Sequence, residues 1–261
     1  MDELNSTKGV ESTDPNDQVG ILALEIMPVS FRLTHAALSR EALCSEIEKI
    51  VTAQFGDTQK FVLVSHSYGT VITTHLLKSS LNRQIGPIVL IDPVSILLHL
   101  PDVAYNFTRR KPSSANELQL YYFASMDMGV SHTLGRHFFW SENILWKEDL
   151  VGRKVTVSLG ARDLIVNTAA VGKYLSQDNA FKTVGLTDGN VENGETQLKR
   201  RNPHNDLLLD KTLVEEDWKT RAWQGNGIEV VWWSDLDHAQ VFDKPDTRKR
   251  ILDVIRLYCK V

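Results

Sequence analysis

The chain has few cysteines, no long apolar run and no excess of positive charge. Its two cysteines, Cys44 and Cys259, lie far apart in segments that we interpret as helices, so a disulfide framework is not expected. No stretch reaches the roughly 18 consecutive apolar residues of a membrane span. A net charge of -4 gives no electrostatic reason to expect nucleic acid or an anionic membrane as a partner.

The beginning of the chain, MDELNSTKGVESTDPNDQ, is acidic and polar. A secretory signal needs a positive start and an apolar centre, and a transit peptide is poor in acidic residues, so neither is indicated. A cytoplasmic location is therefore the default expectation. Scattered histidines, and the lack of Cys/His pairs at ligand spacing, give no reason to expect a metal site or a cofactor.

Apolar strand-like runs alternate with helical patterns along the chain, and with 261 residues, 42% of them hydrophobic, there is enough material for one full core. This alternation predicts an α/β fold whose mostly parallel sheet is flanked by helices. A helix is expected over about 39–54, and a last helix starts at Asp246, a plausible N-cap. We expect strands at 19–29, 60–67, 87–94, 154–163 and 228–238.

Two segments interrupt the alternation within what we take to be a single domain, residues 1–261. The first, about 97–150, lies between the third and fourth strands, is rich in aromatic residues and is expected to be helical in pieces. The second, about 176–226, is polar and contains TDGNVENGETQ, which is typical of a surface loop.

The most informative motif is Ser65-His66-Ser67-Tyr68-Gly69, which follows an apolar strand and precedes a helical run. Strand, turn and helix with a serine between small residues is the context of a nucleophile elbow, usually written G-x-S-x-G. The residues two before and two after the serine must be small because the strand and helix backbones nearly touch. Ser65 meets this demand less comfortably than glycine would.

A serine nucleophile needs a base and a group that orients the base. The order Ser, acid, His is supplied by Ser67, by Asp163 just past the fourth strand, and by His238 past the fifth. The alternative reading of Asp163 is an N-cap or salt-bridge partner for the helix that starts near residue 167. Asp92, which also ends a strand, is the alternative acid.

Three residues close to these candidates in the sequence are not expected to take part in catalysis. Asp235 and Asp237 are too close in sequence to His238 to reach the far side of its ring, so we expect surface carboxylates. His66 should point away from the serine, because side chains diverge on a sharp turn, and is expected to be structural. An oxyanion needs two donors: the backbone N–H of Tyr68 is one, and the second is not identified.

The order and placement of these residues predict a serine hydrolase of carboxylic esters or related acyl bonds, with a small-molecule substrate and an acyl-enzyme intermediate. Two alternatives stay open: a non-catalytic module that binds a ligand in the same pocket, and an acyltransferase. The sequence does not identify the substrate or the oligomeric state.

The chain resembles the α/β-hydrolase superfamily (AB hydrolase domain) over nearly its whole length, and more narrowly a fungal and algal branch of it. The resemblance lies in LEIMPVSFRLTH, FVLVSHSYGT, IDPVSILLHLPDVAYNF, SHTLGRHFFWSENILW and DLDHAQVFD. It implies that residues 97–150 form a cap over the site, with Phe138, Phe139, Trp140 and Trp146 either lining a pocket or packing the cap onto the core.

The resemblance also implies a missing piece. Family members carry, before the equivalent of Val19, a strand that ends in a His-Gly-type loop and donates the second oxyanion hydrogen bond. No His-Gly pair precedes Ser67 here. We therefore expect a chain truncated at its N-terminus, with a gap of about two strand spacings between the first two strands.

Overall fold

In the part of the chain that the structure describes, four parallel strands form the central sheet. A computed structural model describes residues 19–32, 34–177 and 217–260. The strands follow one another across the sheet in chain order, and each pairs in parallel with the next. The prediction of an α/β fold with a parallel sheet flanked by helices is confirmed. The strands are β1 (Phe61–His66), β2 (Ile85–Ile91), β3 (Val155–Gly160) and β4 (Ile228–Trp233).

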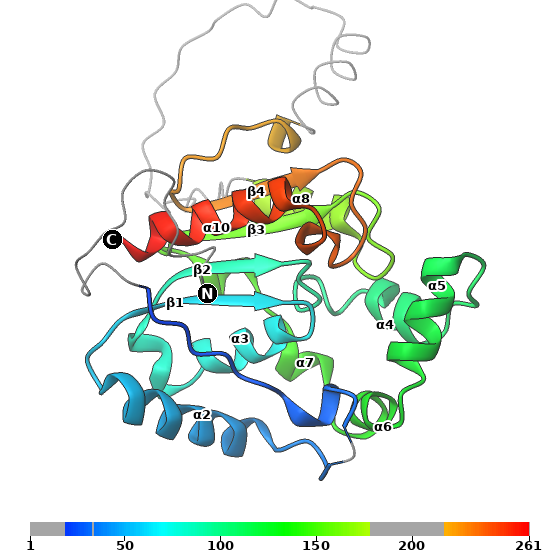
Figure 1. The fold of residues 1–261 in the computed structure, drawn as a ribbon, viewed down its shortest axis with the longest axis horizontal. Coiled ribbons are helices and arrows are strands. Elements are labelled where there is room, and N and C mark those ends of the chain that lie inside the picture. The colour runs from blue at the N-terminus through cyan, green and yellow to red at the C-terminus, as the bar shows by residue number, and fades with distance from the viewer. Residues whose placement is uncertain (1–18, 33, 178–216, 261) are drawn as a thin grey trace, which may run out of the picture.

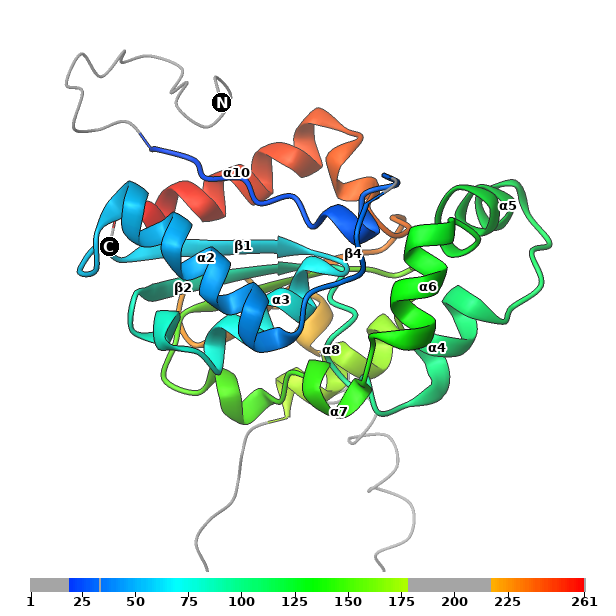
Figure 2. The same ribbon diagram turned by 90° about the horizontal axis from the view of Figure 1, so that it is seen from below.

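Helices cover both faces of this sheet. One face carries α2 (Arg40–Phe55), α3 (Gly69–Leu77) and α8 (Thr168–Ser176), and the other carries α10 (Pro245–Cys259), as Figures 1 and 2 show. The side chains of β2 alternate between two cores: Ile88 and Leu90 join the first, whereas Val89 and Ile91 pack with α10. A parallel strand buried on both faces explains why this part of the sequence is continuously apolar.

The segment between β2 and β3 is helical in pieces, as predicted. Its helices α4 (Pro101–Thr108), α5 (Ala115–Leu120) and α6 (Met128–Arg136) group beyond the carboxyl ends of the strands (Figure 1). A π-helical turn, Tyr121–Ser125, follows α5, and the short α7 (Trp140–Asn143) lies against α3. The 3-10 helices are Met27–Val29, Ser80–Arg83, Lys147–Leu150, Asp217–Lys219 and Gln240–Phe242.

The prediction of a strand over residues 19–29 is wrong. Residues 19–26 form no strand, and a 3-10 turn follows at Met27–Val29. Ile21, Leu22 and Leu24 stay 46%, 37% and 39% exposed. None of the four described strands pairs with this segment, and an extended chain becomes a β-strand only when its backbone groups find partners in a ladder. The apolar run therefore has strand composition without a strand.

The ends of the other predicted elements need smaller corrections. Asp246 is not the N-cap of the last helix: α10 begins at Pro245 with Lys244 as its N-cap, and Asp246 lies in the first turn. Proline suits that first position because it has no N–H to leave unpaired. The N-cap of α2 is Ser39, whose side chain accepts from the Ala42 N–H.

Three further expectations concern what the chain lacks and where its polar excursion lies. Cys44 and Cys259 are free cysteines, as expected, the first buried and the second exposed. Most of the polar excursion, residues 178–216, lies outside the described residues. Among the helices of the described part, none is long and apolar enough to cross a bilayer.

Gly172 on α8 offers a test of this packing. A Cβ added at Gly172 would collide with the buried Trp218 ring, so we expect Gly172→Ala to lower the free energy of unfolding by about 1–3 kcal/mol through overpacking. In α6, a Cβ at Gly135 meets nothing, so Gly135→Ala should raise it by about 0.5–1 kcal/mol through helix propensity. Urea unfolding of both variants checks the pair, and equal stabilisation of both would contradict the packing.

Candidate active site

The sharp turn between β1 and α3 places Ser67 at the carboxyl edge of the sheet. Ser67 has a φ of 49°, a left-handed conformation that is uncommon for a residue other than glycine. Its N–H donates to the Ile91 carbonyl at 3.0 Å, and its carbonyl accepts from the Thr70 hydroxyl at 2.7 Å. Both ends of the strained peptide are thus held by neighbours on β2 and α3.

Ser65 occupies the position where the elbow motif usually has glycine. A Cβ built on Gly69 would lie 3.5 Å from the Ser65 Cβ, an ordinary van der Waals distance. The Ser65 hydroxyl also accepts from the Thr73 hydroxyl at 2.8 Å. The side chain at position 65 is therefore accommodated by the bare backbone at 69 and by a polar partner one turn along α3.

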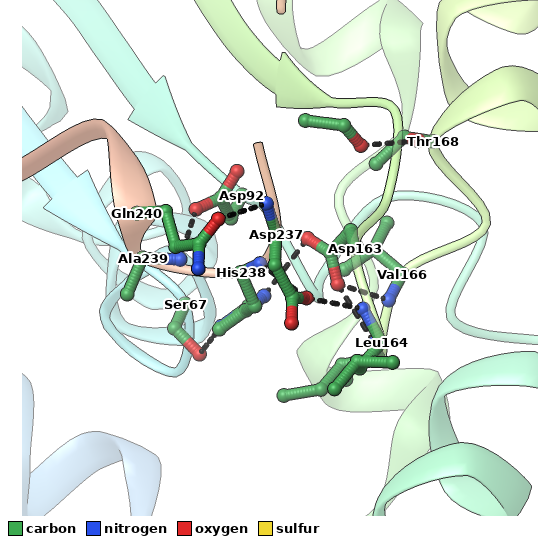
Figure 3. A network of polar contacts seen from close by, with 12 residues as sticks. Ser67, Asp92, Asp163, Leu164, Val166, Thr168, Asp237, His238, Ala239 and Gln240 are labelled. Atoms are coloured by element: carbon green, nitrogen blue, oxygen red, sulfur yellow. Dashed lines mark hydrogen bonds and ion pairs between the residues drawn. The ribbon is translucent and has the colours of Figure 1, made fainter. Parts of the chain in front are cut away.

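Ser67, His238 and Asp163 form a continuous chain of hydrogen bonds across the sheet edge (Figure 3). The His238 Nε2 lies 2.8 Å from the Ser67 Oγ, and its Nδ1 lies 2.9 Å from the Asp163 Oδ2. The three side chains come from the turns after β1, β4 and β3 respectively. The structure thus brings together the serine, histidine and acid that the sequence singled out.

Asp163 is held from its own loop as well as by the histidine. Its Oδ1 accepts from the N–H groups of Ile165 and Val166 at 2.7 and 2.8 Å, and its side chain is fully buried. The alternative role as an N-cap of α8 does not apply, because Asn167 caps that helix. A carboxylate with this many donors is fixed in orientation and has one oxygen free for the imidazole.

The environment of His238 favours its protonated form. Burial opposes the charge on the ring, but the hydrogen bond and the negative charge of Asp163 more than offset it, so the pKa of His238 is raised above its usual value. Asp92 and Asp237 act in the same direction. An imidazole that holds a proton more tightly is a stronger base for a neighbouring hydroxyl.

Three consecutive backbone N–H groups around His238 are each bound by a side chain (Figure 3). The N–H of Asp237 donates to Gln240 Oε1 at 2.8 Å, that of His238 to Asp237 Oδ1 at 2.6 Å, and that of Ala239 to Asp92 Oδ2 at 2.8 Å. The histidine loop therefore has little freedom to move its imidazole.

Asp237 corrects one expectation from the sequence. It is half-buried rather than a surface carboxylate, and its Oδ1 bridges the His238 loop to the Leu164 N–H at 2.9 Å. The signal was present: a short carboxylate can bind backbone N–H groups close to it in sequence, as in Asx turns. Asp235 is exposed and pairs with Lys244 at 3.3 Å, as a surface carboxylate would.

Asp92 and His66 lie beneath the histidine loop. Burial raises the pKa of Asp92 to about 6, and burial together with the nearby His238 lowers the pKa of His66 to about 4. Although His66 Nε2 lies 3.7 Å from Asp92 Oδ2, that nitrogen has no hydrogen bond among the described residues. At neutral pH a charged Asp92 faces a neutral His66, so this contact is not an ion pair.

His66 has ring neighbours on both sides. Its ring centroid lies 5.2 Å from that of His238 and 5.2 Å from that of Phe242, which it meets edge to face. The expectation that His66 serves the structure agrees with this packing. The ring also touches the histidine that bonds Ser67, so His66 belongs to the surroundings of the site.

Within residues 19–32, 34–177 and 217–260, Asp92, Asp163 and His238 form a group that could offer ligand atoms to a metal, since one atom from each lies within 4.8 Å of the others. The same atoms already make hydrogen bonds: both ring nitrogens of His238 are engaged, as are both oxygens of Asp163. A cation here would have to replace that network. The arrangement suits proton transfer better than metal binding.

Residues of the segment between β2 and β3 are tied to the acid and histidine loops. Arg110 Nη2 donates to the Leu164 carbonyl at 2.7 Å, and Asn106 Nδ2 donates to the Ile165 carbonyl at 3.0 Å. Asn116 Nδ2 reaches Asp237 Oδ2 at 3.4 Å. The α4–α5 part of this segment is therefore anchored beside Asp163 and His238.

Of the aromatic residues considered as pocket wall, Phe138 is the one that contacts the elbow. Its ring lies 6.2 Å from that of Tyr68. Phe139 and Trp140 are 60% and 51% exposed. Trp140 and Trp146 lie on His99, with ring centroids 6.5 and 5.3 Å from it. These four residues do not form one continuous wall.

Among known proteins, the chain has matches in solved structures at low sequence identity. No protein-family model matches the chain, and no curated protein sequence does. Among solved structures it is similar to a carboxylesterase from Bacillus subtilis (11% identity, TM-score 0.42, covering 85% of this chain and 68% of that one). It is also similar to a 2-hydroxy-6-oxo-6-phenylhexa-2,4-dienoate hydrolase from Rhodococcus (12% identity, TM-score 0.43, covering 85% of this chain and 74% of that one). A third similar structure is an alpha/beta superfamily hydrolase from Oenococcus oeni (11% identity, TM-score 0.40, covering 85% of this chain and 75% of that one).

The opposite pKa shifts of Asp92 and His66 predict a specific pH effect. His66 binds a proton less readily in the folded than in the unfolded chain, so its burial destabilises the fold at low pH and ceases to do so as pH rises from about 4 to about 6.5. Asp92 has the opposite effect: its contribution to the free energy of unfolding decreases as pH rises from about 4 to about 6. The two contributions should nearly cancel in the wild type.

Replacement of His66 should leave the contribution of Asp92 to the pH dependence of the free energy of unfolding without its opposing partner. We expect the free energy of unfolding of the wild type, minus that of His66→Phe, to increase as pH rises from about 4 to about 6.5. Urea unfolding at several pH values measures it, with His35→Phe at an exposed histidine as the control. A difference for His66→Phe that stays flat over this range would contradict the assigned burial of a neutral ring.

Proposed function

We propose that this protein is a serine hydrolase of the α/β-hydrolase superfamily that acts on carboxylic esters or related acyl bonds of small molecules. The observation that carries the proposal is the hydrogen-bonded chain from Ser67 Oγ through His238 to Asp163, at 2.8 and 2.9 Å, with the serine at a left-handed corner. These distances lie within the range at which a base can take a proton from a nucleophile.

In the proposed reaction, His238 Nε2 takes the Ser67 proton while the oxygen attacks the acyl carbon. Asp163 keeps the Nδ1 proton in place, which leaves Nε2 as the acceptor, and it stabilises the imidazolium that forms. His238 then returns the proton to the leaving alcohol. A water molecule, activated by the same imidazole, cleaves the acyl-enzyme and restores Ser67.

The oxyanion of each tetrahedral intermediate needs donors that are already in place. Tyr68 precedes the first residue of α3, so its N–H lies outside the helical hydrogen-bond ladder and is available for an oxygen bound at Ser67. The positive end of the α3 dipole adds to this effect. One such donor is worth about 10²–10³ in rate.

Residues 97–150 are proposed as a cap over this site. Helices α4, α5 and α6 lie past the carboxyl ends of the strands (Figure 1), and the hydrogen bonds from Asn106, Arg110 and Asn116 attach the α4–α5 part to the acid and histidine loops. The contact of Phe138 with Tyr68 brings apolar surface to the elbow. Such surface suits an acyl chain or an aromatic ester.

A fluorophosphonate probe tests the nucleophile directly, because Ser67 would displace fluoride and stay covalently bound to phosphorus. We expect the purified protein to label on Ser67 by mass spectrometry and to lose labelling in Ser67→Ala and His238→Ala. Asp163→Asn should keep the fold and slow labelling by about 10³- to 10⁴-fold, because the amide oxygen would stay with the Ile165 and Val166 N–H groups and the amide nitrogen, a donor, would face His238 Nδ1. The rate should rise with pH through a value above about 6.5, following the raised pKa of His238.

Ser234→Ala is the matched control, since Ser234 is exposed at the end of β4 and lies outside the hydrogen-bonded chain. It should label like the wild type. Well-folded wild-type protein that does not label would refute the hydrolase and favour a binding module built on the same fold. If the protein labels on Ser67 and the unlabelled enzyme transfers acyl groups from an ester to an added alcohol faster than to water, the reaction is acyl transfer.

A further inference from the structure

Asp92 is buried and has a strained backbone, although it makes no hydrogen bond to the imidazole ring. It follows β2, its side chain is almost entirely buried, and its φ of 46° is left-handed. Its Oδ2 accepts a hydrogen bond from the N–H of Ala239 at 2.8 Å, and Ala239 is itself left-handed with a φ of 65°. Residues other than glycine rarely adopt this backbone conformation, so both positions are strained.

The hydrogen bond joins these two strained residues directly across the site (Figure 3). The Ala239 N–H belongs to the peptide that joins His238 to Ala239, so its hydrogen bond to Asp92 holds the backbone on the C-terminal side of the imidazole. Without an acceptor at Asp92, the Ala239 N–H would lose its partner, and the left-handed turn would lose one of the contacts that oppose its relaxation. The Ser67 Oγ to His238 Nε2 distance depends on that turn.

We propose that Asp92 is a positioning residue of the active site: its carboxylate holds the turn at Ala239, and its charge supports the imidazolium form of His238. This deepens the proposed hydrolase function and rests on it. The two carboxylates have different roles: Asp163 binds the imidazole ring, whereas Asp92 binds the backbone next to the residue that carries the ring.

The charge of Asp92 acts together with that of other groups around the histidine. The ring of His238 is faced by Asp163, Asp92 and Asp237, which raise its pKa, and by the neutral His66. Asp92 in turn is faced by His238, Asp163, Asp237 and His66. Removal of the Asp92 charge should therefore lower the pKa of His238 but leave the Asp163 hydrogen bond to keep the ring oriented.

Two variants at one position separate the hydrogen bond from the charge. Asp92→Asn keeps an acceptor oxygen for Ala239, so its labelling rate at high pH should stay close to wild type, while the acid limb of its pH profile moves to lower pH. Asp92→Ala removes the acceptor too, and its rate at high pH should fall about 10- to 100-fold, because the imidazole is no longer aimed at Ser67. A merely structural role would not move the acid limb of Asp92→Asn.

A spectroscopic readout makes the result independent of catalysis. In the proton NMR spectrum, the His238 Nδ1 proton bound to Asp163 should give a downfield signal that Asp92→Asn retains and Asp92→Ala broadens or loses. Identical losses of rate and signal in the two variants, with thermal unfolding showing both folded, would overturn the backbone role. Wild-type rate and signal in Asp92→Ala would overturn it as well.

The outcome for this proposal can be told apart from the outcome for the hydrolase. If the wild type fails to label but the NMR signal responds to Asp92 as described, the positioning role stands and the proposed reaction fails. If Asp92→Ala does not fold, the Asp92→Asn variant still decides, since an unchanged acid limb and an unchanged His238 pKa would overturn the proposed influence of the charge.

Discussion

The left-handed corner at Ser67 is the constraint on which the rest of the site depends. A serine at φ 49° stores strain that a relaxed loop would release. Here the corner is held by β2 through Ile91 and by α3 through Thr70, and the bond between Ser65 and Thr73 adds a second link between strand and helix. Because these contacts come from the sheet and from the helix that packs on it, the backbone that carries the serine oxygen is anchored to the core.

The parallel sheet then determines what can meet that oxygen. All four strands run in the same direction, so the turns after β1, β2, β3 and β4 open at one edge and supply Ser67, Asp92, Asp163 and His238 in that order. Since the strands follow chain order, the histidine from the last strand must cross back over β3 and β2 to reach the serine. The N–H contacts to Gln240, Asp237 and Asp92 hold the loop in that crossing.

The sequence predicts the site best where the hydrophobic pattern and the chemistry of the residues agree. Ser67, Asp163 and His238 stand at the ends of apolar runs, and parallel strands must bring such ends together. It failed where a pattern needs a partner that the sequence does not reveal: residues 19–29 have strand composition, yet form no ladder. Asp237 was misassigned because closeness to His238 in sequence prevents contact with the far side of the ring but not with its backbone.

Three carboxylates surround one imidazole, yet only Asp163 bonds the ring. Backbone donors explain this outcome, because Asp237 is taken by the Leu164 and His238 N–H groups and Asp92 by that of Ala239. The ring is thus left with a single acceptor at Nδ1, which fixes its tautomer, while the other two carboxylates bind the backbone and act on the ring itself through their charge. A histidine with three free carboxylates nearby would sample several orientations. Because the Asp92 and Asp237 carboxylates are bound to backbone N–H groups, they instead stabilise a single orientation of the imidazole.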